Sequence, residues 1–130
     1  MFLFINSNDP AHTSNTPWDF SVSLHTRPYI KEGTWECALT EFWLKDVDEI
    51  EEDLYVYADF LTYSSLMNGT KSNILRIIRS EGEVANPYFM PLKSMYAAEG
   101  IRVYIRRKDG SIPTMKAEEA TCVLEMRAVE

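Results

Sequence analysis

Side chains that could act as a general base or hold a metal ion are scarce in this sequence. It contains two histidines, His12 and His25, and neither lies in an HxH, HExxH or HxxE pattern. Metal hydrolysis and cupin-type metal chemistry depend on such histidine ligands. We expect His12 to be solvated in a polar segment and His25 to lie on the polar face of a strand. The sequence therefore predicts no metal site.

Nucleophilic side chains show no catalytic spacing either. Cys37 and Cys122 lie far apart without a CxxC pair, so we expect two buried thiols. A Ser-His-Asp or Cys-His site would need His12 or His25 beside a nucleophile, and no Gly-x-Ser-x-Gly motif occurs. We therefore predict no catalytic residue, no cofactor and no enzymatic activity.

Charged residues gather in two places. The acidic run at 46–53 does not fit a calcium loop, because Ile50 occupies the third ligand position and the required glycine is missing. We expect a solvated loop there, with an electrostatic docking patch as the alternative. One basic cluster, which shares a strand with Tyr104, consists of Arg102, Arg106, Arg107 and Lys108. We expect these cations to pair with acidic neighbours or a partner subunit, with contact to nucleic acid by charge and stacking as the alternative.

Composition limits the class of protein and its partners. The chain has 130 residues, enough for one domain over 1–130, and its 20 acidic and 13 basic residues give a net charge of -7. Such a charge disfavours binding to nucleic acid. The apolar start at 1–5 has no basic leader, and no run is long enough to span a membrane. We expect a domain made in the reducing interior of a cell.

The elements that must position these residues are short strands. Apolar runs rich in Val, Ile, Tyr, Phe and Trp recur between turn residues, and they predict about eight strands. The predicted ranges are 2–6, 19–25, 34–44, 54–62, 73–79, 87–92, 101–107 and 120–127. Alternation of apolar and polar residues is clearest at 19–25, 101–107 and 120–127, which predicts one buried face for each strand. At 46–53 one short helical turn is plausible. An antiparallel β-sandwich or barrel follows.

Aromatic residues exceed what one sandwich core readily conceals. There are three tryptophans, seven tyrosines and six phenylalanines. We expect some of these rings to meet another chain, although rings that simply fill the core are the alternative. The candidate subunit-interface residues are Phe42, Trp43, Tyr55, Tyr57, Tyr88 and Phe89. We also expect residues 1–18 to form a partly extended N-terminal arm that orders on contact with a neighbour.

Several short segments of the sequence resemble segments of a known protein family and occur in the same order. They are FLFINSN at 2–8, DFSVSL at 19–24, EGTWECALTE at 32–41, PYFMPL at 87–92, IRVYI at 101–105 and TCVLEMR at 121–127. The chain resembles the penton-like minor capsid proteins of Polinton/Maverick elements and their adintovirus relatives. The resemblance spans nearly the whole chain, and Cys37 departs from it by standing where the family usually has an aliphatic residue.

The resemblance implies a single jelly roll of eight strands and a structural role in the virion. It implies a homopentamer that closes the fivefold vertices of an icosahedral capsid alongside a double jelly-roll major capsid protein, assembled inside the host cell. A carbohydrate- or peptide-binding β-sandwich is the alternative, in which Trp18 or Trp35 would stack on a ligand. A small β-fold enzyme that uses His12 or His25 is a third hypothesis.

Overall fold

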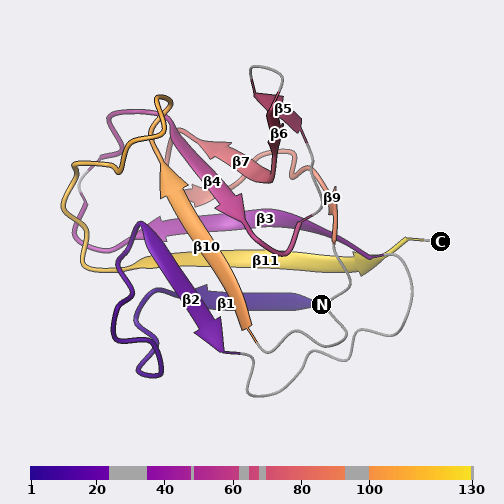
Figure 1. Ribbon diagram of the computed structural model, residues 1–130, viewed down its shortest axis with the longest axis horizontal. Helices are drawn as coiled ribbons and strands as arrows, with labels where there is room; N and C mark the ends of the chain where they lie inside the picture. The colour runs from indigo at the N-terminus through magenta and orange to yellow at the C-terminus, as the bar shows by residue number, and fades with distance from the viewer. Residues whose placement is uncertain (24–34, 48, 62–64, 68–69, 93–99, 130) are drawn as a thin grey trace.

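The computed structural model describes residues 1–23, 35–47, 49–61, 65–67, 70–92 and 100–129. These residues form strands, turns and irregular segments. Among them no helix is present, and so none that is long and apolar enough to cross a membrane. Figure 1 shows two sheets that face each other, with their strands crossing at an angle, and a separate hairpin.

The first sheet has five strands. Its path is β1 (Phe2–Asn6), β11 (Ala120–Ala128), β3 (Trp35–Leu44) and β8 (Gly82–Glu83), and β9 (Met90–Pro91) also pairs with β3. All the pairings are antiparallel. In Figure 1 β1 lies at the lower edge of this sheet, and β11 lies next to it, above it in the view.

The second sheet has four antiparallel strands. They follow the order β2 (Asp19–Ser23), β10 (Gly100–Arg106), β4 (Leu54–Ala58) and β7 (Ile74–Ile78). The separate hairpin consists of β5 (Ser65–Met67) and β6 (Thr70–Ser72).

The path of the chain between the sheets is that of a single jelly roll. Apart from the hairpin, β1, β3, β8, β9 and β11 lie in the first sheet, and β2, β4, β7 and β10 lie in the second. The first and last strands are neighbours, and the chain crosses between the sheets at most connections. Two four-strand paths with this order form the double Greek key of a jelly roll. The predicted antiparallel β-sandwich with a jelly-roll path is confirmed.

Alternating side chains fill the space between the two sheets. In β10, Ile101, Val103 and Ile105 are buried, whereas Arg102 is exposed. The apolar residues of β4 and β11 are buried in the same alternating way. Each fully buried Leu, Ile or Phe stabilises the fold by about 1.5–3 kcal/mol relative to an exposed side chain. The predicted dry face of the 101–107 and 120–127 runs is confirmed.

Two predicted strands are shorter than expected. The strand predicted at 54–62 ends at Ala58, because the main chain turns there and Leu61 N–H donates to the Ala58 carbonyl at 3.4 Å. Phe60 and Leu61 remain buried, so the apolar pattern continues without the strand. The run at 87–92 contributes only Met90–Pro91, since proline cannot donate to a β-ladder. Residues 24–25, 34 and 62 of the predicted strands lie outside the described residues.

Residues 1–18 do not form an extended arm. Phe2–Asn6 is strand β1 and pairs with β11 over its whole length. Residues 9–16 form two turns, with His12 N–H donating to Asp9 and Asn15 N–H donating to His12. Trp18 is buried in the core. In this structure the segment predicted to be an arm is packed on the sandwich, because apolar residues on both sides of the turns anchor it.

The acidic run contains no helical turn in residues 46–47 and 49–53. Asp46 has a positive φ of 62°, which turns the chain after β3. Ile50 is buried and Val47 packs against the core. These two apolar residues therefore belong to a loop that packs on the sandwich, and not to a helical turn.

Candidate functional surfaces

His12 lies against strand β2 rather than in solvent. Its Nε2 atom is 2.8 Å from Ser23 Oγ, and both residues line an open pocket of about 340 Å³. A serine hydrogen-bonded to a histidine supplies the nucleophile and the base of a nucleophilic site, which also needs a third group to orient the histidine. The nearby Asp9 carboxylate accepts the main-chain N–H groups of Ala11 and Ser23. These bonds attach the turns at 9–15 to the edge of β2, and His12 is half-buried there. His25 lies outside the described residues.

The two thiols are inert in the folded chain. Cys37 and Cys122 are both fully buried, and burial raises the pKa of each thiol to about 12. The reactive form of cysteine is the thiolate, so neither side chain has nucleophilic character near neutral pH. The prediction of two buried thiols is confirmed. The described part of the chain also contains no group of three or more residues that could hold a metal ion.

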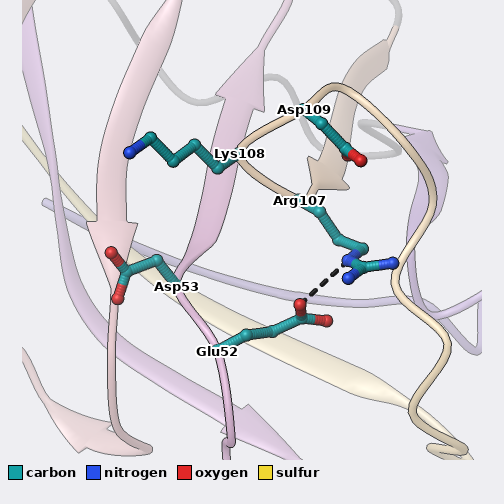
Figure 2. A pocket seen from close by; sticks show the side chains of 5 residues that line it. All are labelled: Glu52, Asp53, Arg107, Lys108 and Asp109. Carbon is teal, nitrogen blue, oxygen red and sulfur yellow. Dashed lines mark hydrogen bonds and ion pairs between the residues drawn. The ribbon is translucent and has the colours of Figure 1, made fainter.

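Part of the acidic run faces the end of the basic cluster. Figure 2 shows Glu52 and Asp53, which precede β4, opposite Arg107, Lys108 and Asp109, which follow β10, around an open pocket of about 580 Å³. Arg107 Nε lies 2.8 Å from Glu52 Oε2. The pocket therefore brings both signs of charge together, and a cation or an anion would meet a like charge there.

The basic side chains of β10 are also paired. Arg102 makes two hydrogen bonds to the Asp19 carboxylate at 2.9 and 2.7 Å, and Arg106 lies 3.6 Å from the same carboxylate. The hydrogen bond from Arg102 lowers the pKa of Asp19 below its ordinary value, and the charges of Arg102 and Arg106 act in the same direction. Together with the Arg107–Glu52 pair, this confirms the predicted pairing with acidic neighbours for the three arginines of the cluster.

Three tyrosines gather on the outer surface of the second sheet. Tyr55 and Tyr57 of β4 and Tyr104 of β10 are half-buried, and Tyr104 lies directly opposite Tyr57. Their two rings stack with centroids 4.9 Å apart and planes only 2° from parallel. The guanidinium groups of Arg102 and Arg106 lie over Tyr104 at 4.7 and 5.3 Å from its centroid. We call Tyr55, Tyr57 and Tyr104 the tyrosine face.

The tyrosine face is held rigidly. Burial raises the pKa of Tyr57, and Tyr104 and Tyr55 add to that rise. Tyr104 Oη donates to Asn73 Oδ1 at 3.3 Å. The cation–π contacts and the hydrogen bond orient Tyr104, and stacking holds Tyr57 against it, so these two rings are positioned without a partner.

Exposed aromatic rings also occur on the outer surface of the first sheet. Phe2 and Phe4 of β1 are 55% and 74% exposed, and Trp43 of β3 is 47% exposed. Trp43 Nε1 donates to Glu41 Oε1 at 3.2 Å. A Cβ atom at Gly82 would lie 3.6 Å from the Trp43 ring, so the indole lies over this glycine of β8.

The segment before β9 is held by both sheets. The Arg76 guanidinium of β7 lies 4.9 Å from the Tyr88 ring, and the Arg127 guanidinium of β11 lies 3.5 Å from the Phe89 ring. Tyr88 is 63% exposed, whereas Phe89 is half-buried. This segment offers a ring to solvent at the side of the sandwich.

The six predicted interface residues therefore do not form one surface. Tyr55 and Tyr57 belong to the tyrosine face, Trp43 to the first sheet, and Tyr88 and Phe89 to the segment before β9. Phe42 is fully buried in the core, so its side chain cannot contact a partner in this fold. The prediction for Phe42 is corrected, because the residue points between the sheets. Sequence reasoning missed Phe2, Phe4 and Tyr104 as interface candidates. Alternation within 101–107 does mark Tyr104 as lying on an outer face, whereas residues 2–5 are all apolar and do not show which rings face outward.

Comparison of the chain with protein-family models, with curated proteins and with solved structures finds no match.

Proposed function

We propose that this chain is a structural virion protein, a penton-like minor capsid subunit that assembles as a homopentamer at icosahedral fivefold vertices beside a major capsid protein. One observation carries the proposal. After the jelly roll has closed around its core, aromatic rings remain on the outside of both sheets, with Trp43 and Tyr88 each about half exposed or more.

The fold supports a structural role but does not select it alone. Viral capsid proteins, lectins and cupins all use jelly rolls, and function resides in surfaces added to a fold. The proposal therefore also draws on the resemblance to penton-like proteins, which rests on several sequence segments and on their order along the chain.

The tyrosine face has the properties of a protein-binding surface. Tyrosine and arginine are enriched where binding energy concentrates in interfaces. The stacked Tyr57 and Tyr104 rings are already fixed, so a partner that covers them immobilises few additional rotamers. We expect electrostatics to set the register of the contact and apolar burial to supply most of its affinity.

A closed ring needs two different surfaces on each subunit. The tyrosine face and the Tyr88–Phe89 segment are two such surfaces, and they belong to different parts of the sandwich. Trp43 on the first sheet is a third apolar contact. The candidate interface thus consists of Trp43, Tyr55, Tyr57, Tyr88 and Phe89.

The carbohydrate-binding alternative has weaker support. It placed Trp18 or Trp35 against a ligand, but Trp18 is only 8% exposed and Trp35 is half-buried against the core. The Tyr57 and Tyr104 rings face each other, so their stacked faces are not open to a sugar.

Native mass spectrometry of the purified chain, alone and with the major capsid protein, tests the proposal. We expect the mass of five chains or a whole multiple of it, and we expect Tyr57→Ala to weaken assembly by roughly 30-fold, which corresponds to about 2 kcal/mol. Thr13→Ala, at an exposed site away from these rings, is the control. A chain that stays outside every fivefold assembly, with and without the major capsid protein, would rule the proposal out.

A further inference from the structure

Within the part of the chain that the structure describes, strand β1 leaves one side of its backbone unpaired. The Met1 carbonyl accepts Met126 N–H, and Ser7 N–H donates to the Ala120 carbonyl, so the odd-numbered residues of this segment exchange hydrogen bonds with β11. In an antiparallel pair the residues between them point their N–H and C=O groups the other way. The main-chain groups of Phe2, Phe4 and Asn6 therefore face outward. No described residue forms a hydrogen bond with the main chain of Phe2 or Phe4 on that side.

The outer edge of β2 is protected by side chains. Asn15 Oδ1 accepts Ser21 N–H at 3.0 Å, and Asn15 Nδ2 donates to the Ser21 carbonyl at 2.9 Å. Asp9 Oδ2 accepts Ser23 N–H at 3.2 Å. A second chain would have to displace both side chains in order to pair with this edge.

The two remaining edges are protected in other ways. Opposite β1, the edge of the first sheet is divided between β8 and β9, each only two residues long. Strand β7 contains a register shift, and its Arg76 side chain donates to the carbonyls of Ala85 and Asn86, which holds that loop beside it. Short strands, bulges and covering loops are the devices by which sheets prevent edge pairing. Among residues whose structure is described, none of these devices protects strand β1.

The side chains of β1 match an apolar partner. Phe2 and Phe4 are the two most exposed rings of the first sheet, at 55% and 74%. Leu3 packs only partly against the core. No residue from 1 to 8 has a charged side chain, although the chain as a whole has a net charge of -7. Two copies can therefore approach along this edge without like charges facing each other.

We propose that β1 pairs antiparallel with β1 of a second copy about a twofold axis, which joins two first sheets into one continuous sheet. The other described edges of the sandwich are protected, and the hairpin strands β5 and β6 are only three residues long, so the edge of a second copy that fits β1 is β1 itself. Such a contact is isologous. The proposal is independent of the fivefold ring and adds a second kind of contact to the subunit.

The outward-facing residues define the register. With Phe4 opposite Phe4 of the second copy, Phe2 lies opposite Asn6, and every outward-facing main-chain group of the strand finds a partner. The Phe4 rings meet on the outer surface, where aromatic cross-strand pairs are stabilising. On the inner surface Leu3 lies opposite Ile5 of the second copy, which extends the apolar core across the junction.

Mass measurement on Phe4→Lys tests the pairing. A lysine on an edge strand blocks strand addition, and Phe4 points away from the core, so the variant should fold. We expect the wild-type assembly to have twice the mass of the variant, whether the variant is a single chain or a ring. The test is therefore equally informative if the chain does not form a fivefold ring. Ile112→Lys, at another exposed apolar residue, should leave the doubled mass unchanged. Equal masses for wild type and Phe4→Lys would refute the proposal.

Cross-linking tests the register. Directly opposed residues of a hydrogen-bonded pair have Cα atoms about 5.5 Å apart, so Phe4→Cys places two thiols side by side. We expect a short bismaleimide to join two Phe4→Cys chains and not two Ile112→Cys chains. The natural Cys37 and Cys122 are buried and should not react. Absence of a Phe4→Cys dimer, in protein shown to be folded by circular dichroism, would refute the twofold pairing.

Discussion

Asp19 binds two arginines with one carboxylate at the edge of the tyrosine face. Its bidentate bonds to Arg102 and its contact with Arg106 hold both guanidinium groups over Tyr104. The Asp19 side chain is 36% exposed. Its main contribution to the structure is therefore to hold the two arginines in position, and not to fill the core.

Removing this charge should lower stability only where the carboxylate is ionised. The pKa of Asp19 is lower in the folded chain than in the unfolded chain. Its contribution is therefore fully present above the unfolded value of about 3.9 and is lost as pH falls through the folded pKa. We expect Asp19→Asn to lower the free energy of unfolding by up to about 1 kcal/mol at neutral pH, a figure reduced for solvent screening.

Urea titrations at decreasing pH measure this effect. The difference between wild type and Asp19→Asn should shrink in acid, whereas the difference for the uncharged control Thr13→Ala should stay constant. A gap that persists after the carboxylate is protonated would show that Asp19 acts through packing instead.

Phe42 and Trp43 show what sequence alone can reveal about single residues. Both are large aromatics in one apolar run, and both are predicted to be interface residues. One is 0% and the other 47% exposed. The sequence predicted a strand at 34–44 that contains both residues, but it could not show which ring points inward.

At the scale of the element, the register shift in β3 explains that difficulty. Glu41 pairs with Val123 and Leu39 pairs with Leu124, so Thr40 is an extra residue. Before it, Cys37 and Leu39 point inward; after it, Phe42 and Leu44 do. A β-bulge changes the parity of the alternation. Thr40 Oγ1 donates to the Val123 carbonyl at 3.0 Å and holds the bulge in place.

Alanine at these two neighbouring positions should have very different effects. We expect Phe42→Ala to destabilise the fold by about 3–5 kcal/mol, because it leaves a cavity in the core. Trp43→Ala should cost about 1 kcal/mol or less, because the ring lies over Gly82 with half its surface exposed. Urea denaturation monitored by circular dichroism gives both values. Similar losses at the two sites would contradict the bulged register.

Asn15 protects a strand edge, and its removal should expose that edge. Asn15→Ala removes the bonds to Ser21 N–H, the Ser21 carbonyl and the Ser7 carbonyl. We expect a loss of about 1–3 kcal/mol and faster hydrogen exchange at the Ser21 amide. Asn8→Ala, at an exposed side chain, should leave exchange at Ser21 unchanged. Unaltered protection in Asn15→Ala would show that another group covers the edge.

Much of the fold could be predicted from sequence, because period-two alternation marks long strands such as 101–107 and 120–127. The elements that were missed are short or depend on distant contacts. Strand β8 is only two residues long and includes Gly82, whose φ is 104°. Strands β5 and β6 flank the Asn68-Gly69 pair, which lies outside the described residues. The anchoring of residues 9–15 depends on side-chain bonds to β2 that no local pattern encodes.

At the scale of the whole molecule, most strand pairings join residues far apart in sequence. The β1–β11 pair unites the two ends of the chain, and β2 pairs with β10. Folds dominated by such contacts form slowly, because long loops must close before contacts stabilise them.

We therefore expect refolding from urea on a timescale of milliseconds to seconds, measured by stopped-flow tryptophan fluorescence. Trp18 is buried in the core and should report formation of the sandwich. The Trp18→Phe variant serves as the control for the signal of the other two tryptophans. Complete refolding within microseconds would contradict the dominance of long-range pairing.

The position of β1 beside β11 has a further consequence during synthesis on the ribosome. The FLFI segment at 2–5 is translated more than 110 residues before β11, the strand with which β1 pairs among the described residues. Until β11 has been translated, this apolar segment lacks that partner strand. Nascent chains on one messenger RNA then expose the segment to one another. The same hydrophobic stretch is therefore a natural target for a chaperone that binds the growing polypeptide.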